Sequence, residues 1–149
     1  MVRTALTGFL LLSLLLLHAS SAQAHCQVPC GIYGDHMRVR QMKEDLATIT
    51  KAMKKIRALS KKKDAKSRNQ LVRWVVTKEQ HAEKIIRTIS DYFMAQKIKP
   101  GKPKYVEKLK AHHAVMVAAM KCKQTTDGKA AAALGKAITG VAGYWPHKH

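Results

Sequence analysis

Two cysteines close to the start of the chain are the clearest candidates for chemistry. Cys26 and Cys30 lie within the run His25–Tyr33, with Pro29 directly before the second thiol and Gly31 directly after it. Proline and glycine favour a tight turn, so this loop can bring both sulfur atoms to the same side. Two thiolates held in this way could bind a metal ion or could be oxidised to a disulfide.

The residues before this loop have the features of a secretory signal peptide. A basic start precedes an apolar run from Phe9 to Leu17, and Ala22-Gln23-Ala24 matches a small-residue cleavage site. The apolar run is shorter than the roughly 20 residues that a transmembrane helix needs, so we expect no membrane association after cleavage. We predict that residues 1–24 are removed and that residues 25–149 form one domain. Export through the secretory route would deliver it to the periplasm, the cell exterior or the lumen of an organelle.

Cleavage after Ala24 would make the α-amine of His25 available as a metal ligand. This amine and the amide nitrogen of Cys26 close a five-membered chelate ring, and the thiolates of Cys26 and Cys30 complete a set of two nitrogens and two sulfurs. A planar set of this kind suits Ni(II) or Cu(II), and the imidazole of His25 remains as an axial ligand. On spacing alone two alternatives stay open: a disulfide between the two cysteines, as in many secreted proteins, or part of a tetrahedral zinc site.

Hydrophobic periodicity predicts the elements that must carry this loop. Apolar residues recur at steps of three and four in three segments, and an alanine-rich fourth segment follows the N-cap candidates Thr125-Thr126-Asp127. The four predicted helices are Asp35–Leu59, about Asn69–Lys97, Lys104 to about Lys121, and Gly128–Gly143. No segment is typical of a strand. The expected fold is therefore all-α, an antiparallel four-helix bundle over about residues 35–143 with an irregular N-terminal metal-binding hook at residues 25–33.

The same periodicity predicts which side chains form the core. The first helix presents an apolar stripe that includes Met42 and Met53, and we assign both methionines to packing. The expected stripe of the second helix is Val72, Val75, Ala82, Ile86, Ile89 and Phe93, with Glu79 in one apolar position. Cys122 is expected to be a buried small residue. The tail Tyr144–His149 is expected to be flexible.

The composition limits the classes of function. The chain of 149 residues has 28 Lys and Arg against 9 Asp and Glu, a formal net charge of +19, and 46% hydrophobic residues. So many apolar residues allow a packed core. The charge alone would indicate a binder of nucleic acid or acidic surfaces. Because aromatic residues make up only 5%, base stacking has little support, and we expect no specific nucleic-acid partner.

The run His-Cys-x-x-Pro-Cys-Gly-x-Tyr at His25–Tyr33 resembles the nickel hook of nickel-containing superoxide dismutases. Arg73–Gln80 resembles the Arg-x-x-x-x-Lys-Glu-Gln helix of this family, and Ser90–Phe93 resembles its Asp-Tyr-Phe segment. The resemblance extends over nearly all of residues 25–149. It implies a four-helix bundle, a homohexamer, one nickel ion per subunit, and superoxide as the substrate.

The resemblance also implies roles for individual residues. His25 would supply its amine and axial imidazole, Cys26 its amide nitrogen and thiolate, and Cys30 a second thiolate. The remaining three site residues are Tyr33 over the open face of the metal, Tyr92 as a second tyrosine near it, and Arg73, which would orient the axial imidazole. The chain departs from the family pattern at Gln27, where Asp is common, at Met94, where some members have Lys, and over Met37–Gln41, which lacks the expected carboxylate.

Two functions from different classes follow from this sequence. The first is an oxidoreductase that converts superoxide to O₂ and H₂O₂ by cycling between Ni(II) and Ni(III). The second is a secreted cationic helical binding protein in which Cys26 and Cys30 form a disulfide. Nickel content, thiol titration and superoxide consumption distinguish them.

Overall fold

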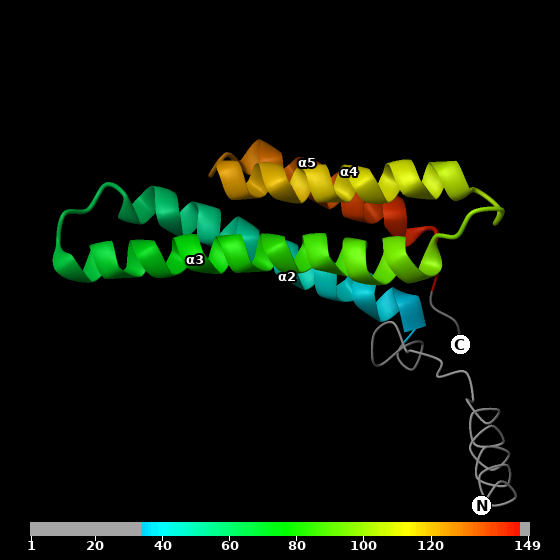
Figure 1. Ribbon diagram of the computed structural model, residues 1–149. Coiled ribbons are helices and arrows are strands. Elements are labelled where there is room, and N and C mark those ends of the chain that lie inside the picture. Colours follow the sequence, from blue (N-terminus) through cyan, green and yellow to red (C-terminus); the bar gives the residue numbers. More distant parts are fainter. Residues whose placement is uncertain (1–33, 147–149) are drawn as a thin grey trace, which may run out of the picture.

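The computed structural model describes residues 34–146, and within that range the chain forms helices without strands. Five helical segments follow one another: α2 (Gly34–Leu59), α3 (Ala65–Arg87), the π-helix η1 (Thr88–Lys97), α4 (Tyr105–Gln124) and α5 (Gly128–Ala142). Because η1 continues α3 directly, these segments make four helical rods (Figure 1). The predicted all-α bundle is confirmed.

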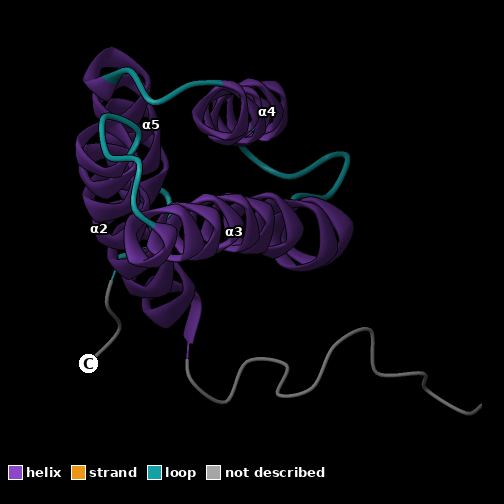
Figure 2. Cartoon of the chain, turned by 90° about the vertical axis from the view of Figure 1, so that its left-hand side faces the viewer, coloured by secondary structure: helices purple, strands orange, loops and turns teal. Residues whose placement is uncertain are grey.

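The rods pack as two hairpins laid against each other. α2 contacts α3 and α5, and α4 contacts α3 and α5. The α2–α3 hairpin is the longer one, and its connecting loop extends past the end of the α4–α5 pair (Figure 1). Seen from that end, the four rods surround a common interior (Figure 2). No helix in the described part of the chain is long and apolar enough to cross a membrane.

Local chemistry explains where the helices begin. The side chain of Asp64 accepts a hydrogen bond of 2.8 Å from the backbone N–H of Ser67, which caps α3 and starts it at Ala65. The sequence prediction placed this start about four residues later because it assigned Ser60–Arg68 to a loop. Asp127 caps α5 in the same way, as expected, by accepting from the N–H of Lys129 at 2.9 Å.

The core combines the apolar stripes of all four rods. Its fully buried members include Met42, Phe93 and Leu134. Both core methionines of α2 are buried, as predicted. Cys122 is buried with a free thiol, which confirms its expected packing role, and burial raises its pKa to about 11.

The predicted stripe of the second helix is wrong at its N-terminal end. Val72 and Val75 are 62% and 38% exposed, whereas Lys78 is only 4% exposed. Lys78 lies on the inward face of α3. Its ammonium group donates hydrogen bonds to the carbonyl oxygens of Cys122 and Lys123 at the end of α4, and to the carboxylate of Glu79. These carbonyls lack partners within their own helix, so a buried lysine satisfies them.

The start of the C-terminal tail is also packed rather than flexible. Trp145 is 8% exposed, and its indole N–H donates a 2.9 Å hydrogen bond to Nε2 of the fully buried His112. The Nδ1 atom of His112 lies 2.7 Å from the carbonyl oxygen of Lys108, to which it donates. His112 is therefore neutral, with both ring nitrogens occupied. Residues 147–149 lie outside the described residues.

Candidate metal centre

Four of the six predicted site residues precede the first described residue. His25, Cys26, Cys30 and Tyr33 lie outside the described residues, so their predicted roles stay predictions. Tyr33 is bonded to Gly34, and Cα atoms of consecutive residues are about 3.8 Å apart. The first turn of α2 is therefore the part of the described structure that borders the predicted hook.

A cluster of polar and charged side chains lies at this first turn. The hydroxyl of Tyr92 donates a 2.7 Å hydrogen bond to Oδ1 of Asp35, and Nζ of Lys97 lies 2.9 Å from the same oxygen. The guanidinium carbon of Arg38 is 5.0 Å from the centre of the Tyr92 ring, and Nζ of Lys97 is 5.3 Å from it. We call Asp35, Arg38, Tyr92 and Lys97 the α2-start cluster.

The π-helical geometry of η1 explains why two of these residues share a face. Tyr92 and Lys97 are five positions apart, and in an α-helix that separation rotates two side chains by about 140° from each other. A π-helix closes its hydrogen bonds between residues five apart and so brings such residues towards the same face. The N–H of Ile98 donates to the carbonyl of Phe93 over this spacing, at 2.9 Å.

Burial and charge set the protonation of the cluster. The pKa of Tyr92 is raised, first by burial of its ring and then by the hydrogen bond and charge of Asp35. Burial alone would lower the pKa of Lys97, but the hydrogen bond and charge of Asp35 outweigh it, and the net change is upward. At neutral pH the cluster therefore holds a neutral phenol next to a protonated ammonium group.

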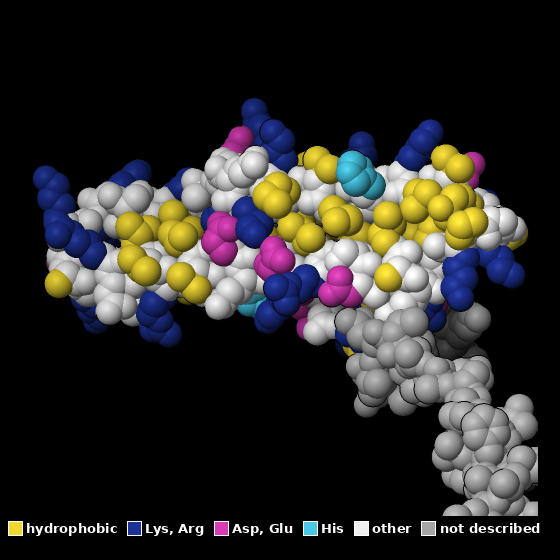
Figure 3. All heavy atoms as spheres, viewed as in Figure 1, with side chains coloured by type: hydrophobic (Ala, Val, Ile, Leu, Met, Phe, Trp, Pro, Cys, Tyr) yellow, Lys and Arg dark blue, Asp and Glu magenta, His cyan; other side chains and the backbone are white. Residues whose placement is uncertain are grey.

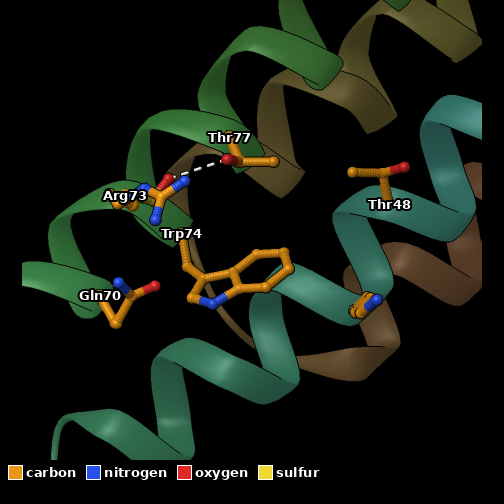
Figure 4. A pocket seen from close by; sticks show the side chains of 6 residues that line it. Thr48, Gln70, Arg73, Trp74 and Thr77 are labelled. Carbon is orange, nitrogen blue, oxygen red and sulfur yellow. Dashed lines mark hydrogen bonds between the residues drawn. The ribbon is translucent and has the colours of Figure 1, made fainter. Parts of the chain in front are cut away.

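Arg73 lies far from this cluster within the same chain. It lines a groove between α3 and α2 together with Trp74 and Lys51 (Figure 4). Lys51 stands 17 residues after Gly34 (51 − 34), which is about 25 Å along α2 at about 1.5 Å per residue. The structure thus brings Tyr92 to the first turn of α2 and places Arg73 elsewhere on the bundle.

Two polar pairings were not predicted from the sequence. The first joins Asp35 to Tyr92 and Lys97. The sequence assigned no role to Asp35 or Lys97, and the five-residue spacing of Lys97 from Tyr92 was the signal that could have indicated their shared face. His81 and Asp45 form a second pair, with Nδ1 and Oδ1 2.6 Å apart between α3 and α2. Across the described residues no group of three or more His, Cys, Asp or Glu side chains could hold a metal ion.

The fold and the described part of the site define a helical-bundle protein in which Tyr92 contacts the first turn of α2, the helix that follows the thiol-bearing segment in the sequence. The comparison with protein-family models gave a match to the nickel-containing superoxide dismutases over residues 20–149. This match covers most of the chain, and the chain belongs to that family. It is accordingly a superoxide dismutase, an oxidoreductase with nickel as its cofactor. Searches of curated proteins and of solved structures gave no match.

Proposed function

We propose that superoxide is converted to O₂ and H₂O₂ at residues 25–33, after cleavage behind Ala24 has exposed the amine of His25. The observation that carries this proposal is the hydrogen bond between Tyr92 and Asp35. It joins the tyrosine of the Asp-Tyr-Phe segment to Asp35, which follows Tyr33 by two positions in the sequence, although 57 positions separate the two partners. Such a contact is expected if Tyr92 belongs to the centre.

The donor set of the hook fits nickel. His25 would provide its amine and imidazole, Cys26 its amide nitrogen and thiolate, and Cys30 its thiolate, for one ion per subunit. Nitrogen and thiolate donors suit this metal. When bound, nickel supplies a centre that can take one electron from superoxide and return one to a second superoxide.

The residues around the hook would bind the substrate and handle protons. Formation of H₂O₂ consumes two protons for every two superoxide ions, and we assign Tyr33 the ordering of substrate and of the water that delivers them. The Tyr92 hydroxyl gives its hydrogen to Asp35 and also interacts with the ammonium group of Lys97, so we assign it the positioning of these two side chains beside that water. Lys97 and Arg38 provide positive charge near Tyr92. This positive charge attracts the superoxide anion.

Arg73 is not part of the centre that we propose. It lines a groove about 25 Å along α2 from Gly34, at about 1.5 Å per residue, whereas Tyr92 lies at the start of that helix. The resemblance implied that Arg73 orients the imidazole of His25, and the proposed centre does without this contact.

Exposed apolar surface supports assembly of several subunits. Hydrophobic side chains form a band over α3 and α4 on one face of the molecule (Figure 3). Both helices carry large exposed hydrophobic residues, namely Val72, Val75, Val76, Val106, Val117 and Met120. Apolar patches of this kind typically mark interfaces. We propose that they pack between subunits of a homohexamer, and that the protein works in an exported compartment.

The position of the first residue tests the proposed centre. Protein that begins at His25 is expected to bind one nickel per chain and to consume superoxide, whereas the same chain with one additional N-terminal residue loses activity because its α-amine is displaced. Cys26→Ser is expected to lose both nickel and activity, with Cys122→Ser as the matched control that keeps both. Full activity of the extended protein, or a Cys26–Cys30 disulfide with no nickel uptake, would refute the proposal.

A further inference from the structure

We propose that the groove between α2 and α3 next to Trp74 binds a nucleoside monophosphate, a small anion with a flat base and a phosphate group. This site would be separate from the metal centre. It lies near the connecting loop of the α2–α3 hairpin, where the hairpin extends past α4 and α5 (Figure 1).

The groove is formed by two facing stripes of side chains. Gln70, Arg73, Trp74 and Thr77 recur at steps of three and four and therefore lie on one face of α3. Thr48 and Lys51 are three apart on α2 and complete the lining. The cavity has a volume of about 310 Å³, the lower end of the range for sites that bind small molecules. Figure 4 shows the indole of Trp74 between the two helices.

The charge of the groove selects an anion. Its lining contains one lysine and one arginine and no carboxylate. Of the ion pairs formed among residues 34–146, none includes Lys51 or Arg73. Two cations without acidic partners match the two negative charges of a phosphate monoester, and a guanidinium group binds phosphate oxygens with two parallel hydrogen bonds.

The uncharged members of the lining select a flat, polar ring. The Trp74 indole offers an aromatic face on which a nucleobase can stack. Nζ of Lys51 lies 5.8 Å from the centre of that indole, so one ligand could reach both groups. The hydroxyls of Thr48 and Thr77 donate to carbonyls of their own helices, which leaves their oxygens as acceptors. The Gln70 amide adds donors and an acceptor, a mixture that suits a nucleobase better than a hydrocarbon ring.

Calorimetry and tryptophan fluorescence of the full folded protein test this site with three probes: AMP, adenosine and inorganic phosphate. AMP is expected to bind at one site per chain and to quench Trp74, with adenosine and phosphate each binding about tenfold more weakly because each makes only part of the contacts. Lys51→Gln is expected to weaken AMP binding about tenfold. Trp74→Phe is expected to remove the quenching.

Lys55→Gln is the matched control, since it removes the same charge from an exposed position of α2 outside the groove. Equal weakening by Lys51→Gln and Lys55→Gln, or equal affinity for AMP and phosphate, would show general attraction to a cationic surface and would overturn the proposal. Absence of quenching would overturn it as well, including the case in which another subunit fills the groove. Binding is expected with and without nickel, and Lys51→Gln should leave dismutase activity unchanged, so this test is independent of the metal centre.

Discussion

The hydroxyl of Tyr92 is the single group that best tests the α2-start cluster. Tyr92→Phe removes the hydrogen bond to Asp35 but leaves the ion pair of Asp35 with Lys97 in place. We expect kcat/KM for superoxide to fall, and the free energy of unfolding to fall by only about 1 kcal/mol, the net value of one hydrogen bond. Stopped-flow superoxide decay and urea denaturation measure the two quantities.

Tyr144→Phe provides the comparison for Tyr92→Phe. Tyr144 is half-buried beside His112, at the packed start of the C-terminal tail rather than in the α2-start cluster. We expect this variant to keep full kcat/KM. A loss of activity equal to that of Tyr92→Phe would show that the tyrosine hydroxyls act through overall packing.

His112 predicts a loss of stability in mild acid. Its pKa is lowered mainly by burial, and the charge of Lys108 acts in the same direction against the hydrogen bond to the Lys108 carbonyl. A histidine with a lower pKa in the folded protein binds fewer protons folded than unfolded, so its contribution to stability is complete above about pH 6.5 and declines as the pH falls below that value. Protonation would also remove the acceptor of the Trp145 indole.

Thermal denaturation between pH 5 and 8 measures this effect. The wild-type melting temperature is expected to decrease below about pH 6.5, and His112→Gln should have a smaller decrease because the titrating group is gone. His113→Gln changes an exposed neighbour and should follow the wild type. An unchanged pH dependence in His112→Gln would assign the acid sensitivity to other groups.

At the level of single residues, short motifs can be recognised in the sequence, whereas long-range partners cannot. Cys26, Cys30 and Tyr92 were predicted as site residues because they lie in short runs with distinctive spacing, and these roles stay predictions. Asp35 was missed because its significance comes from Tyr92, which is distant in the sequence and adjacent only after folding. Lys97 was missed because its position depends on a π-helix, and periodicity based on α-helical turns places it on another face.

At the level of elements, Lys78 connects α3 to the end of α4. Lys78→Met is expected to keep the packing volume but to leave the carbonyls of Cys122 and Lys123 without their donor. Buried acceptors without partners cost about 1–3 kcal/mol, so we expect a decrease of this size in the free energy of unfolding. Chemical denaturation followed by circular dichroism measures it.

Lys84→Met is the control for this element, since it removes a lysine from an exposed position six residues further along α3. It should change the stability by less than about 0.5 kcal/mol. If both variants lose the same stability, Lys78 has no special part in ending α4.

The helices themselves followed closely from hydrophobic periodicity, with three informative exceptions. The stripe of α2 was predicted except at one position, where Asp45 is buried because it pairs with His81 of α3. The stripe of α3 was wrong because Lys78 occupies an inward position, and sequence patterns assign lysine to the surface. The prediction of a flexible tail was wrong at Trp145, because its indole donates to a specific acceptor in His112, a tertiary contact that composition does not reveal.

At the level of the whole molecule, the structure shows which positive charges lie at the start of α2 and which lie far from it. The net charge is +19, yet only charge near the reaction centre accelerates arrival of a small anion, because ions screen charges beyond about 10 Å at 0.1 M salt. Arg38 lies beside Tyr92 at the start of α2, whereas Lys61 lies in the exposed loop at the opposite end of that helix. The two residues carry the same charge at opposite ends of the bundle.

Comparing these two ends tests whether the charge guides superoxide. The kcat/KM of the wild type is expected to fall as ionic strength rises, because screening weakens the attraction. Arg38→Gln should lower kcat/KM at low salt and flatten this dependence without breaking the pair of Asp35 and Lys97, while Lys61→Gln should follow the wild type. Equal salt dependence in all three proteins would mean that the charge has no part in guiding the substrate and that the lysines act elsewhere, as at the phosphate-binding groove or in adhesion to acidic surfaces.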